Sequence, residues 1–233
     1  MSIHCGTIDE RATARTRARY DRNATFYDLM TRGSETRLVQ PRAEMWKSVH
    51  GPRVLEVGVG TGINLRYYPP DMQITAIDLS PKMLERARSR ARQLGVEVDL
   101  READVQALPF DDASFDSVVA TCVFCSVPDP ILGLRELRRV LVPGGQLFLL
   151  EHVLSQRPVV RQLMRLMNPM VVRMMGANID LETVESVRSA GYEDLQVDDL
   201  WLEIFKRIES HAPAATAVAS EVFVPTTLGN AVR

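Results

Sequence analysis

The chain has 233 residues, of which 45% are hydrophobic and 25% charged, a composition typical of a globular protein with one main domain. Its net charge of -2 excludes a globally basic nucleic-acid binder, and its 3 cysteines are too few for a disulfide framework, which favours a reducing, cytoplasmic compartment. There is no signal-peptide core and no run of about 18 apolar residues, so no membrane-spanning helix is expected.

The N-terminal part of the chain is basic. We expect residues 1–16, which are polar and arginine-rich, to be loosely ordered, and helices to follow from about Arg17 to Trp46, where apolar residues recur at helical spacing. Up to Arg53, ten Lys and Arg stand against six Asp and Glu. Residues 1–50 are therefore interpreted either as helices with a solvated face that pad a sheet, or as a lid over a ligand site that also meets anionic lipid.

The next stretch is a short apolar run, 53–57, that ends in Gly58, Gly60 and Gly62. Glycines at the end of a strand let backbone N–H groups and a helix N-terminus approach a ligand closely. In a doubly wound sheet this turn is where a nucleotide-type cofactor docks. A helix is expected over 63–68, before two prolines stop it.

Apolar runs and amphipathic helices alternate along most of the remaining chain. The expected strands are 73–77, 98–102, 115–122 and 146–152, and the expected helices are 82–94, 129–141 and 180–190. Two last strands, 194–201 and 203–208, are joined so tightly that they should be antiparallel. The pattern predicts an α/β fold with a doubly wound, mostly parallel sheet and helices on both faces. Residues 212–233 are expected to form a flexible tail.

The segment 154–176 differs from its surroundings because it is basic and rich in methionine. Arg157, Arg161 and Arg165 recur every four residues, which places them on one helical face, and no acid lies between His152 and Asp180. Methionine-rich surfaces adapt to varied apolar partners. Two interpretations remain open: a core helix with a solvated stripe, or a cap over a substrate pocket that lies on an anionic membrane.

Acids at strand ends discriminate between cofactors. The nicotinamide fingerprint needs Gly or Ala where this chain has Ile63. Asp78, at the end of the second strand, can accept hydrogen bonds from both hydroxyls of a ribose. Asp104 can accept from an adenine amino group, and Glu56 could neutralise an amino-acid ammonium. Three acids around a nucleoside pocket favour the cationic S-adenosylmethionine over NAD, which carries a pyrophosphate.

Together these motifs resemble class I S-adenosylmethionine-dependent methyltransferases from about Tyr20 to His211. The motifs are Glu56-x-Gly58-x-Gly60-x-Gly62, Asp78, Asp104–Phe110, Phe115-Asp116 and Pro143–Gly145. The resemblance implies a Rossmann-like, seven-stranded sheet with one antiparallel strand, in a domain over residues 51–211. The expected cofactor-binding residues are Tyr27, Glu56, Gly58, Gly60, Asp78, Leu79, Asp104, Val105 and Thr121.

Two subgroups are especially similar. Tyr27 resembles the N-terminal tyrosine that closes over the cofactor in quinone-pathway C-methyltransferases. Membrane-associated thiol and phospholipid methyltransferases match at 67–70, 124–127, 151–153 and 176–178. This resemblance implies a small-molecule or lipid acceptor (a phospholipid amine, a thiol or a quinol) and a cytoplasmic protein that can attach peripherally to an anionic membrane.

Methyl transfer from a sulfonium is an in-line displacement, to which positioning can contribute about 7–11 kcal/mol. A base is needed only if the acceptor arrives protonated, and His152 is the candidate, with a structural histidine as the alternative. Cys122 and Cys125 are expected to line the pocket, since no further ligands complete a metal site. An NAD-dependent oxidoreductase and a catalytically silent S-adenosylmethionine-binding module remain alternatives, and the sequence leaves the oligomeric state and the methylated atom open.

Overall fold

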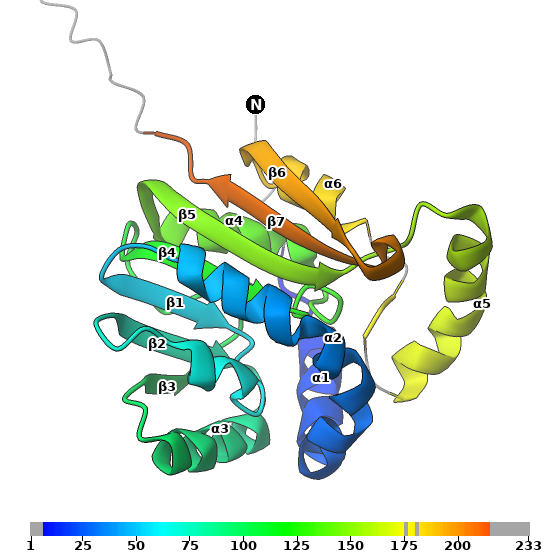
Figure 1. Cartoon of the computed structure of the whole chain (residues 1–233), viewed down its shortest axis with the longest axis horizontal. Helices are drawn as coiled ribbons and strands as arrows, with labels where there is room; N and C mark the ends of the chain where they lie inside the picture. The colour runs from blue at the N-terminus through cyan, green and yellow to red at the C-terminus, as the bar shows by residue number, and fades with distance from the viewer. Residues whose placement is uncertain (1–6, 175–176, 180–181, 215–233) are drawn as a thin grey trace, which may run out of the picture.

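The structure is a computed structural model that describes residues 7–174, 177–179 and 182–214, and in this part of the chain helices flank one central sheet (Figure 1). The strands are β1 (Arg53–Val57), β2 (Gln73–Asp78), β3 (Asp99–Glu102), β4 (Phe115–Thr121), β5 (Leu141–His152), β6 (Glu193–Leu200) and β7 (Phe205–His211). Their spatial order is β3-β2-β1-β4-β5-β7-β6. Among the strands of the described residues, β7 runs in the direction opposite to the other six, which confirms the predicted sheet.

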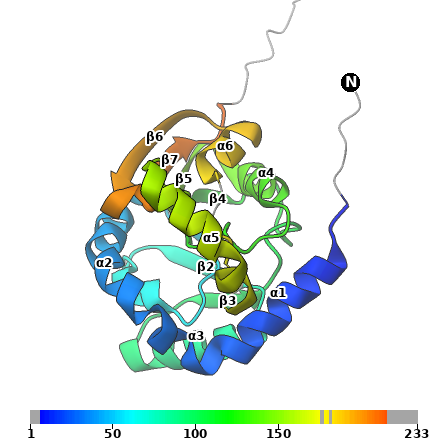
Figure 2. The ribbon, with the colours of Figure 1, turned by 90° about the vertical axis from the view of Figure 1, so that its right-hand side faces the viewer.

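The helices lie on both faces of the sheet. They are α1 (Glu10–Asn23), η1 (Ala24–Phe26), α2 (Tyr27–Ser48), η2 (Ile63–Tyr67), α3 (Pro81–Leu94), α4 (Pro130–Val140), α5 (Pro158–Met174), α6 (Thr183–Ser189) and η3 (Trp201–Glu203). Helices α2 and α3 cover one face and α4 and α6 the other, whereas α5 stands to one side (Figures 1 and 2). None of the helices in the described part of the chain has the length and apolar character needed to span a bilayer.

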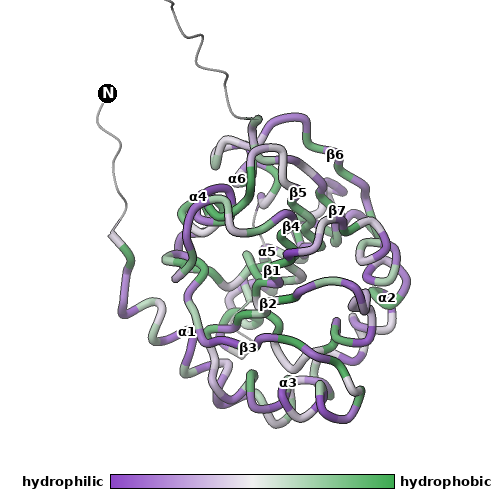
Figure 3. The backbone as a smooth tube through the Cα atoms, turned by 90° about the vertical axis from the view of Figure 1, so that its left-hand side faces the viewer, coloured by the Kyte–Doolittle hydropathy of each residue, from purple (hydrophilic) through white to green (hydrophobic). Residues whose placement is uncertain are grey.

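The core follows from the alternation of side chains along the central strands. On β1, Val54 packs with Trp46 of α2, while Leu55 and Val57 pack with Leu134 of α4 on the other face. Trp46 and Leu55 are 1% and 0% exposed, and burying such a side chain stabilises the fold by about 1.5–3 kcal/mol. The central strands are therefore hydrophobic while α1 is largely hydrophilic (Figure 3).

The structure corrects the expectation that residues 1–16 are loose. Helix α1 already begins at Glu10, because the side chain of Asp9 accepts hydrogen bonds from the backbone N–H groups of Arg11 and Ala12, at 3.0 Å each. No residue of α1 is buried, so the apolar periodicity that predicts helices was absent here. Residues 1–6 lie outside the described part of the chain, as do residues 215–233 of the expected tail.

Several other boundaries differ from the expected ones; the last two strands, for example, are separated by the 3-10 helix η3 at Trp201–Glu203. The helix expected over 63–68 is a 3-10 helix of 5 residues, since it is confined between the left-handed Gly62 and the prolines that follow. Strand β5 begins at Leu141 rather than at residue 146. The register against β4 shifts between Leu141 and Gln146, so the residues expected to form a turn are part of the strand. The helix expected over 180–190 covers Thr183–Ser189, and residues 180–181 are outside the described ranges.

Candidate functional site

A cleft lies at the carboxyl ends of the central strands, where the strand order changes direction between β1 and β4. It surrounds about 690 Å³ of empty space, part of it open to solvent. Its lining comprises Thr16, Tyr20, Tyr27, Val57, Gly58, Gly60, Ile77, Asp78, Leu79, Met83, Ala103, Asp104, Val105, Thr121, Cys122, Val123, Ser126, Val127 and Pro128. Eight of the ten residues proposed from the sequence are in this set; Glu56 and His152 are not.

Asp78 connects the glycine turn to the second strand. Its Oδ2 accepts a hydrogen bond from the backbone N–H of Gly60 and its Oδ1 one from that of Ser80, both at 2.8 Å. Burial raises the pKa of Asp78 to about 6, although these backbone donors partly oppose the shift. Each carboxylate oxygen keeps a further acceptor position, so Asp78 fits the two hydroxyls of a ribose.

Asp104 lies just beyond β3 and is held by its neighbours. Its Oδ1 accepts from the backbone N–H of Gln106 at 2.9 Å, and its Oδ2 from the Gln106 side chain at 3.0 Å and from the Thr13 hydroxyl at 3.3 Å. Gln106 also accepts from the backbone N–H of Asp129 at 3.0 Å, which links this loop to the start of α4. Asp104 and the adjacent Val105 both line the cleft, as the sequence predicted for an adenine site.

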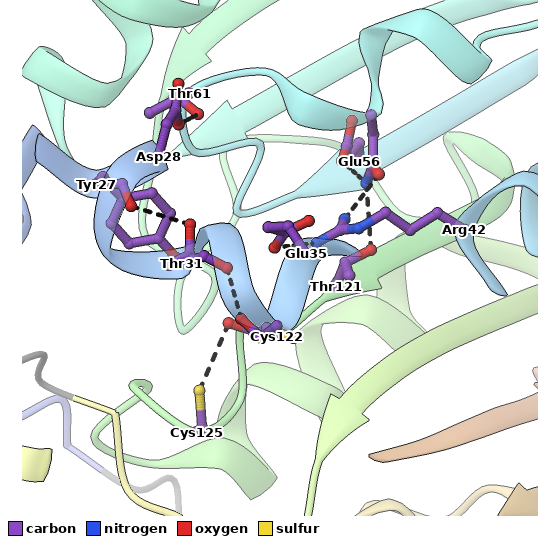
Figure 4. A network of polar contacts seen from close by, with 12 residues as sticks. Tyr27, Asp28, Thr31, Glu35, Arg42, Glu56, Thr61, Thr121, Cys122 and Cys125 are labelled. Atoms are coloured by element: carbon purple, nitrogen blue, oxygen red, sulfur yellow. Dashed lines mark hydrogen bonds and ion pairs between the residues drawn. The ribbon is translucent and has the colours of Figure 1, made fainter. Parts of the chain in front are cut away.

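Glu56 takes part in a buried polar network behind the cleft (Figure 4). One of its oxygens accepts from Asn64 at 2.6 Å and the other from the hydroxyl of Tyr68. Arg42 donates to Asn64 at 2.7 Å and to Glu35 at 2.9 Å, so the network joins α2 to β1 and η2. Burial raises the pKa of Glu56 to about 7. Both carboxylate oxygens have partners, and the ammonium contact expected for Glu56 remains a prediction.

His152 lies at the end of β5 but does not line the cleft. Its ring packs edge-on against Phe205, with centroids 5.0 Å apart. Burial lowers its pKa to about 4, which keeps the imidazole neutral, and its Nδ1 is buried with no hydrogen-bond partner among the described residues. The structure therefore does not bring His152 to the cleft wall, and its catalytic role stays a prediction.

Helix α1 contributes cleft residues that sequence reasoning missed. The Tyr20 hydroxyl is hydrogen-bonded to the side chain of Ser126, and Thr16 donates to the Ser126 carbonyl at 3.5 Å. Tyr20 also lies beside Tyr27, with ring centroids 6.1 Å apart. The sequence showed Tyr20 only as an aromatic point in a helical pattern, and nothing in that pattern indicated which loop it would meet.

Polar contacts hold α1 across three strand-end loops. After β2, Asp21 accepts from the Ser80 hydroxyl at 2.5 Å; after β3, Thr13 donates to Asp104 and Arg17 pairs with Glu102. Because α1 buries no residue, these contacts and those to the loop after β4 must hold it in place. The interpretation of residues 1–50 as a lid remains a prediction.

A second residue missed from the sequence is Glu151, a fully buried acid on β5. Its Oε1 accepts from the backbone N–H groups of Val123 and Phe124 at 2.9 and 3.3 Å, which fixes the loop after β4. Its Oε2 has no hydrogen-bond partner among the described residues, and burial raises its pKa to about 7. The sequence signal that could have revealed Glu151 is its place beside His152 at the end of an expected strand.

The two cysteines of this loop differ in position. Cys122 lines the cleft, as expected, whereas Cys125 does not, and its thiol donates to the Cys122 carbonyl at 3.5 Å. Burial raises the pKa of both thiols, so neither is an activated nucleophile. Within the described ranges, no group of three or more His, Cys, Asp or Glu side chains is arranged to hold a metal ion.

The chain is similar to known methyltransferases. The family model of the methyltransferase domain matches residues 55–149. Phosphatidylethanolamine N-methyltransferase of Cereibacter sphaeroides is 41% identical over 45% of this chain and 53% of its own length. Thiol S-methyltransferase TMT1B of Homo sapiens is 35% identical over 54% of this chain and 55% of its own. This chain thus spans about half the length of these two curated relatives.

A longer match establishes the family. Demethylmenaquinone methyltransferase of Clavibacter sepedonicus is 32% identical over 76% of this chain and 79% of its own length. Among solved structures, the cyclase SpnF has the same fold, with a TM-score of 0.62 and 24% identity over 77% of this chain and 82% of its own. The chain belongs to the S-adenosylmethionine-dependent methyltransferases of this methyltransferase domain family.

Proposed function

We propose that the protein transfers a methyl group from S-adenosylmethionine to an apolar small-molecule or lipid acceptor. The observation that carries the proposal is the cleft itself: the glycine turn at Gly58 and Gly60 meets a buried Asp78, and Asp104 follows at the next strand end. Family membership supports the methyl donor, and the carboxylates suit its adenosine part.

Each predicted cofactor-binding residue has a role that fits its position. The bound donor supplies a methyl group carried on a positively charged sulfonium. Gly58 and Gly60 form the turn against its methionine part, with room beside Gly60, and Asp78 accepts from its ribose hydroxyls. Asp104 accepts from the adenine amino group, while Tyr27 closes the cleft from α2. The remaining wall, including Leu79, Val105 and Thr121, excludes water and orients the methyl group toward the acceptor.

The acceptor is proposed to be apolar because of the wall that faces it. Val123, Val127 and Pro128, all in the loop after β4, line the cleft. The names of three relatives specify phosphatidylethanolamine, a thiol and demethylmenaquinone as acceptors. We extend the class to this chain, and we propose that it works as a cytoplasmic protein attached peripherally to the lipid that holds such acceptors.

An acceptor panel tests the proposal. The protein is incubated with S-adenosylmethionine and, separately, with phosphatidylethanolamine, an apolar thiol and a reduced quinone. S-adenosylhomocysteine and the methylated product are then measured by mass spectrometry. With one of the three acceptors, we expect S-adenosylhomocysteine and the methylated product to form in equal amounts. Donor binding without product for any acceptor would favour a silent binding module, and a thermal shift with NAD alone would favour an oxidoreductase.

A protonated acceptor needs a base, and β5 offers two titratable neighbours. Neither Glu151 nor His152 lines the cleft, but Glu151 holds the loop that does, whereas His152 packs against Phe205, so Glu151 is the first candidate to test. Glu151→Gln keeps an oxygen for the two backbone N–H groups and removes the base. We expect turnover with a thiol or ammonium acceptor to fall by about 100-fold, in the range of general base catalysis, with donor affinity unchanged. Unchanged turnover of the Glu151→Gln variant would make His152 the candidate base, and the His152→Gln variant would then test it.

Donor binding should depend on pH through Asp78. Its pKa is raised to about 6 in the free protein, so the carboxyl group is increasingly protonated below that pH. Hydroxyl donors stabilise the carboxylate, so binding should lower this pKa and affinity should be highest above about pH 7. Below pH 6, affinity should fall by up to about tenfold per pH unit. Calorimetry from pH 5 to 8 measures this, and a flat profile for the wild type would contradict the assignment.

A further inference from the structure

Large apolar side chains are exposed on three separate segments of the chain. Ten of them, each at least 40% exposed, form what we name the apolar rim: Phe26, Leu29 and Met30 around the start of α2, Val159, Leu163, Leu166, Met167 and Met170 on α5, and Trp201 and Leu202 on η3. Leu166 and Val159 are as much as 78% and 82% exposed. An apolar surface of this extent on a soluble domain marks an interaction site.

The three segments lie on the side of the molecule where the parallel strands end, since η1 and α2 precede the sheet beside the cleft, α5 follows β5 and η3 follows β6. Figure 2 looks onto the carboxyl ends of the parallel strands, and α5 crosses in front of them, with α2 and α1 on either side. Tyr27, which follows Phe26 directly, lines the cleft. The guanidinium of Arg37 on α2 lies 4.2 Å from the ring centroid of Trp201, and Arg157 pairs with Glu203 at 3.1 Å, so η3 joins α2 to the start of α5.

Helix α5 presents an apolar stripe to solvent. Val159, Leu163, Leu166 and Met170 follow one another at helical spacing and therefore lie on one face. The inward side is represented by Met164, which is only 6% exposed. A helix that needed apolar residues only for packing against its own domain would carry them on the inward side alone. The outer stripe therefore points to an apolar partner.

The charges beside the stripe indicate what kind of partner this is. Helix α5 contains no acidic residue, and its Arg165 and Arg173 are exposed. Arg161 pairs with Glu182 at 2.9 Å. For Arg165 and Arg173, no ion pair is seen within the described residues, so they are the unpaired cations on the exposed side of α5. Apolar side chains flanked by arginine are the combination that interfacial helices use on anionic lipid.

We propose that the apolar rim docks on an anionic lipid bilayer, with the outer stripe of α5 in the interfacial layer and the mouth of the cleft facing the lipid. One part of this inference rests on the proposed function: an apolar acceptor would enter the cleft directly from the bilayer. The sequence suggested lipid contact for residues 1–50 and for the segment 154–176; the structure narrows the first to η1 and the start of α2 and adds η3 to the same surface.

Vesicle co-sedimentation tests the docking. The full chain is mixed with vesicles of phosphatidylcholine, or of phosphatidylcholine with phosphatidylglycerol, at low and high salt. We expect binding to the anionic vesicles, weakened by salt. The double variant Leu166→Gln and Met170→Gln should lose at least about tenfold in partitioning, since each side chain gives up burial in lipid. Arg165→Gln with Arg173→Gln should lose the preference for anionic vesicles.

A matched control is available on α3. Leu94 is 46% exposed at the end of that helix, which runs back from the carboxyl end of β2 toward the start of β3, away from the mouth. Leu94→Gln should bind vesicles like the wild type. No binding of the wild type to anionic vesicles at low salt, or an equal loss in the Leu94 variant, would overturn the docking proposal. S-adenosylmethionine affinity in solution should be the same in all variants, so the proposed methyl transfer is judged separately.

Discussion

Replacing Asp78 with alanine is expected to weaken S-adenosylmethionine binding by about 100-fold or more while the protein remains folded. The proposed binding mode gives this carboxylate two hydrogen bonds from ribose hydroxyls, and bonds to charged groups contribute about 1.5–3 kcal/mol each. A loss of about 3 kcal/mol corresponds to roughly two powers of ten in affinity. Alanine removes the burial cost of this acid but also leaves the N–H groups of Gly60 and Ser80 without their acceptor, so the two effects oppose each other and the fold should survive with a modest loss of stability.

Calorimetry with the donor measures this loss, and circular dichroism verifies the fold. Asp78→Asn keeps one acceptor oxygen and should give an intermediate affinity that no longer varies with pH between 5 and 7. Asp116→Ala is the matched control, since it removes a carboxylate that binds Arg53 at the opposite ends of the strands. An Asp78→Ala protein with wild-type affinity would remove the basis for the cofactor site.

The second large effect is expected at Gly58. Its φ of 66° is in the left-handed region, and a Cβ there would overlap the side chain of Val123. The backbone strain costs about 1–2 kcal/mol, and forcing a methyl group into a packed space typically costs about 1–3 kcal/mol more. Gly58→Ala should therefore destabilise the protein by about 2–5 kcal/mol and displace the loop that lines the cleft, with a loss of donor binding.

Gly95 provides the control for strain alone. It has the same φ of 66°, but a Cβ there would meet nothing within 4 Å. Gly95→Ala should cost only the strain of about 1–2 kcal/mol and leave donor affinity intact. Urea unfolding of both variants measures the difference, and adding Val123→Ala to Gly58→Ala should recover part of it. Equal stability of the two alanine variants would show that the contact with Val123 does not matter.

The sequence by itself determined the sheet and the centre of the cleft. Strands and helices were predicted where the periodicity of apolar residues is strong, and the glycine turn, Asp78 and Asp104 were found because parallel strands place their carboxyl ends at one edge. These features depend on local spacing and on one topological rule, so they needed no knowledge of long-range contacts. The same reasoning failed for residues 10–16, where a polar helix is capped by Asp9 and carries no apolar periodicity.

Only the tertiary structure decided which elements meet at the cleft. It brought Thr13 to Asp104 across 91 residues of sequence, and it packed His152 against Phe205 while leaving Glu151 against the loop after β4. It also gathered three separate segments into the apolar rim. Local sequence cannot specify such arrangements, because the burial and the pKa of a side chain depend on neighbours that come from distant parts of the chain.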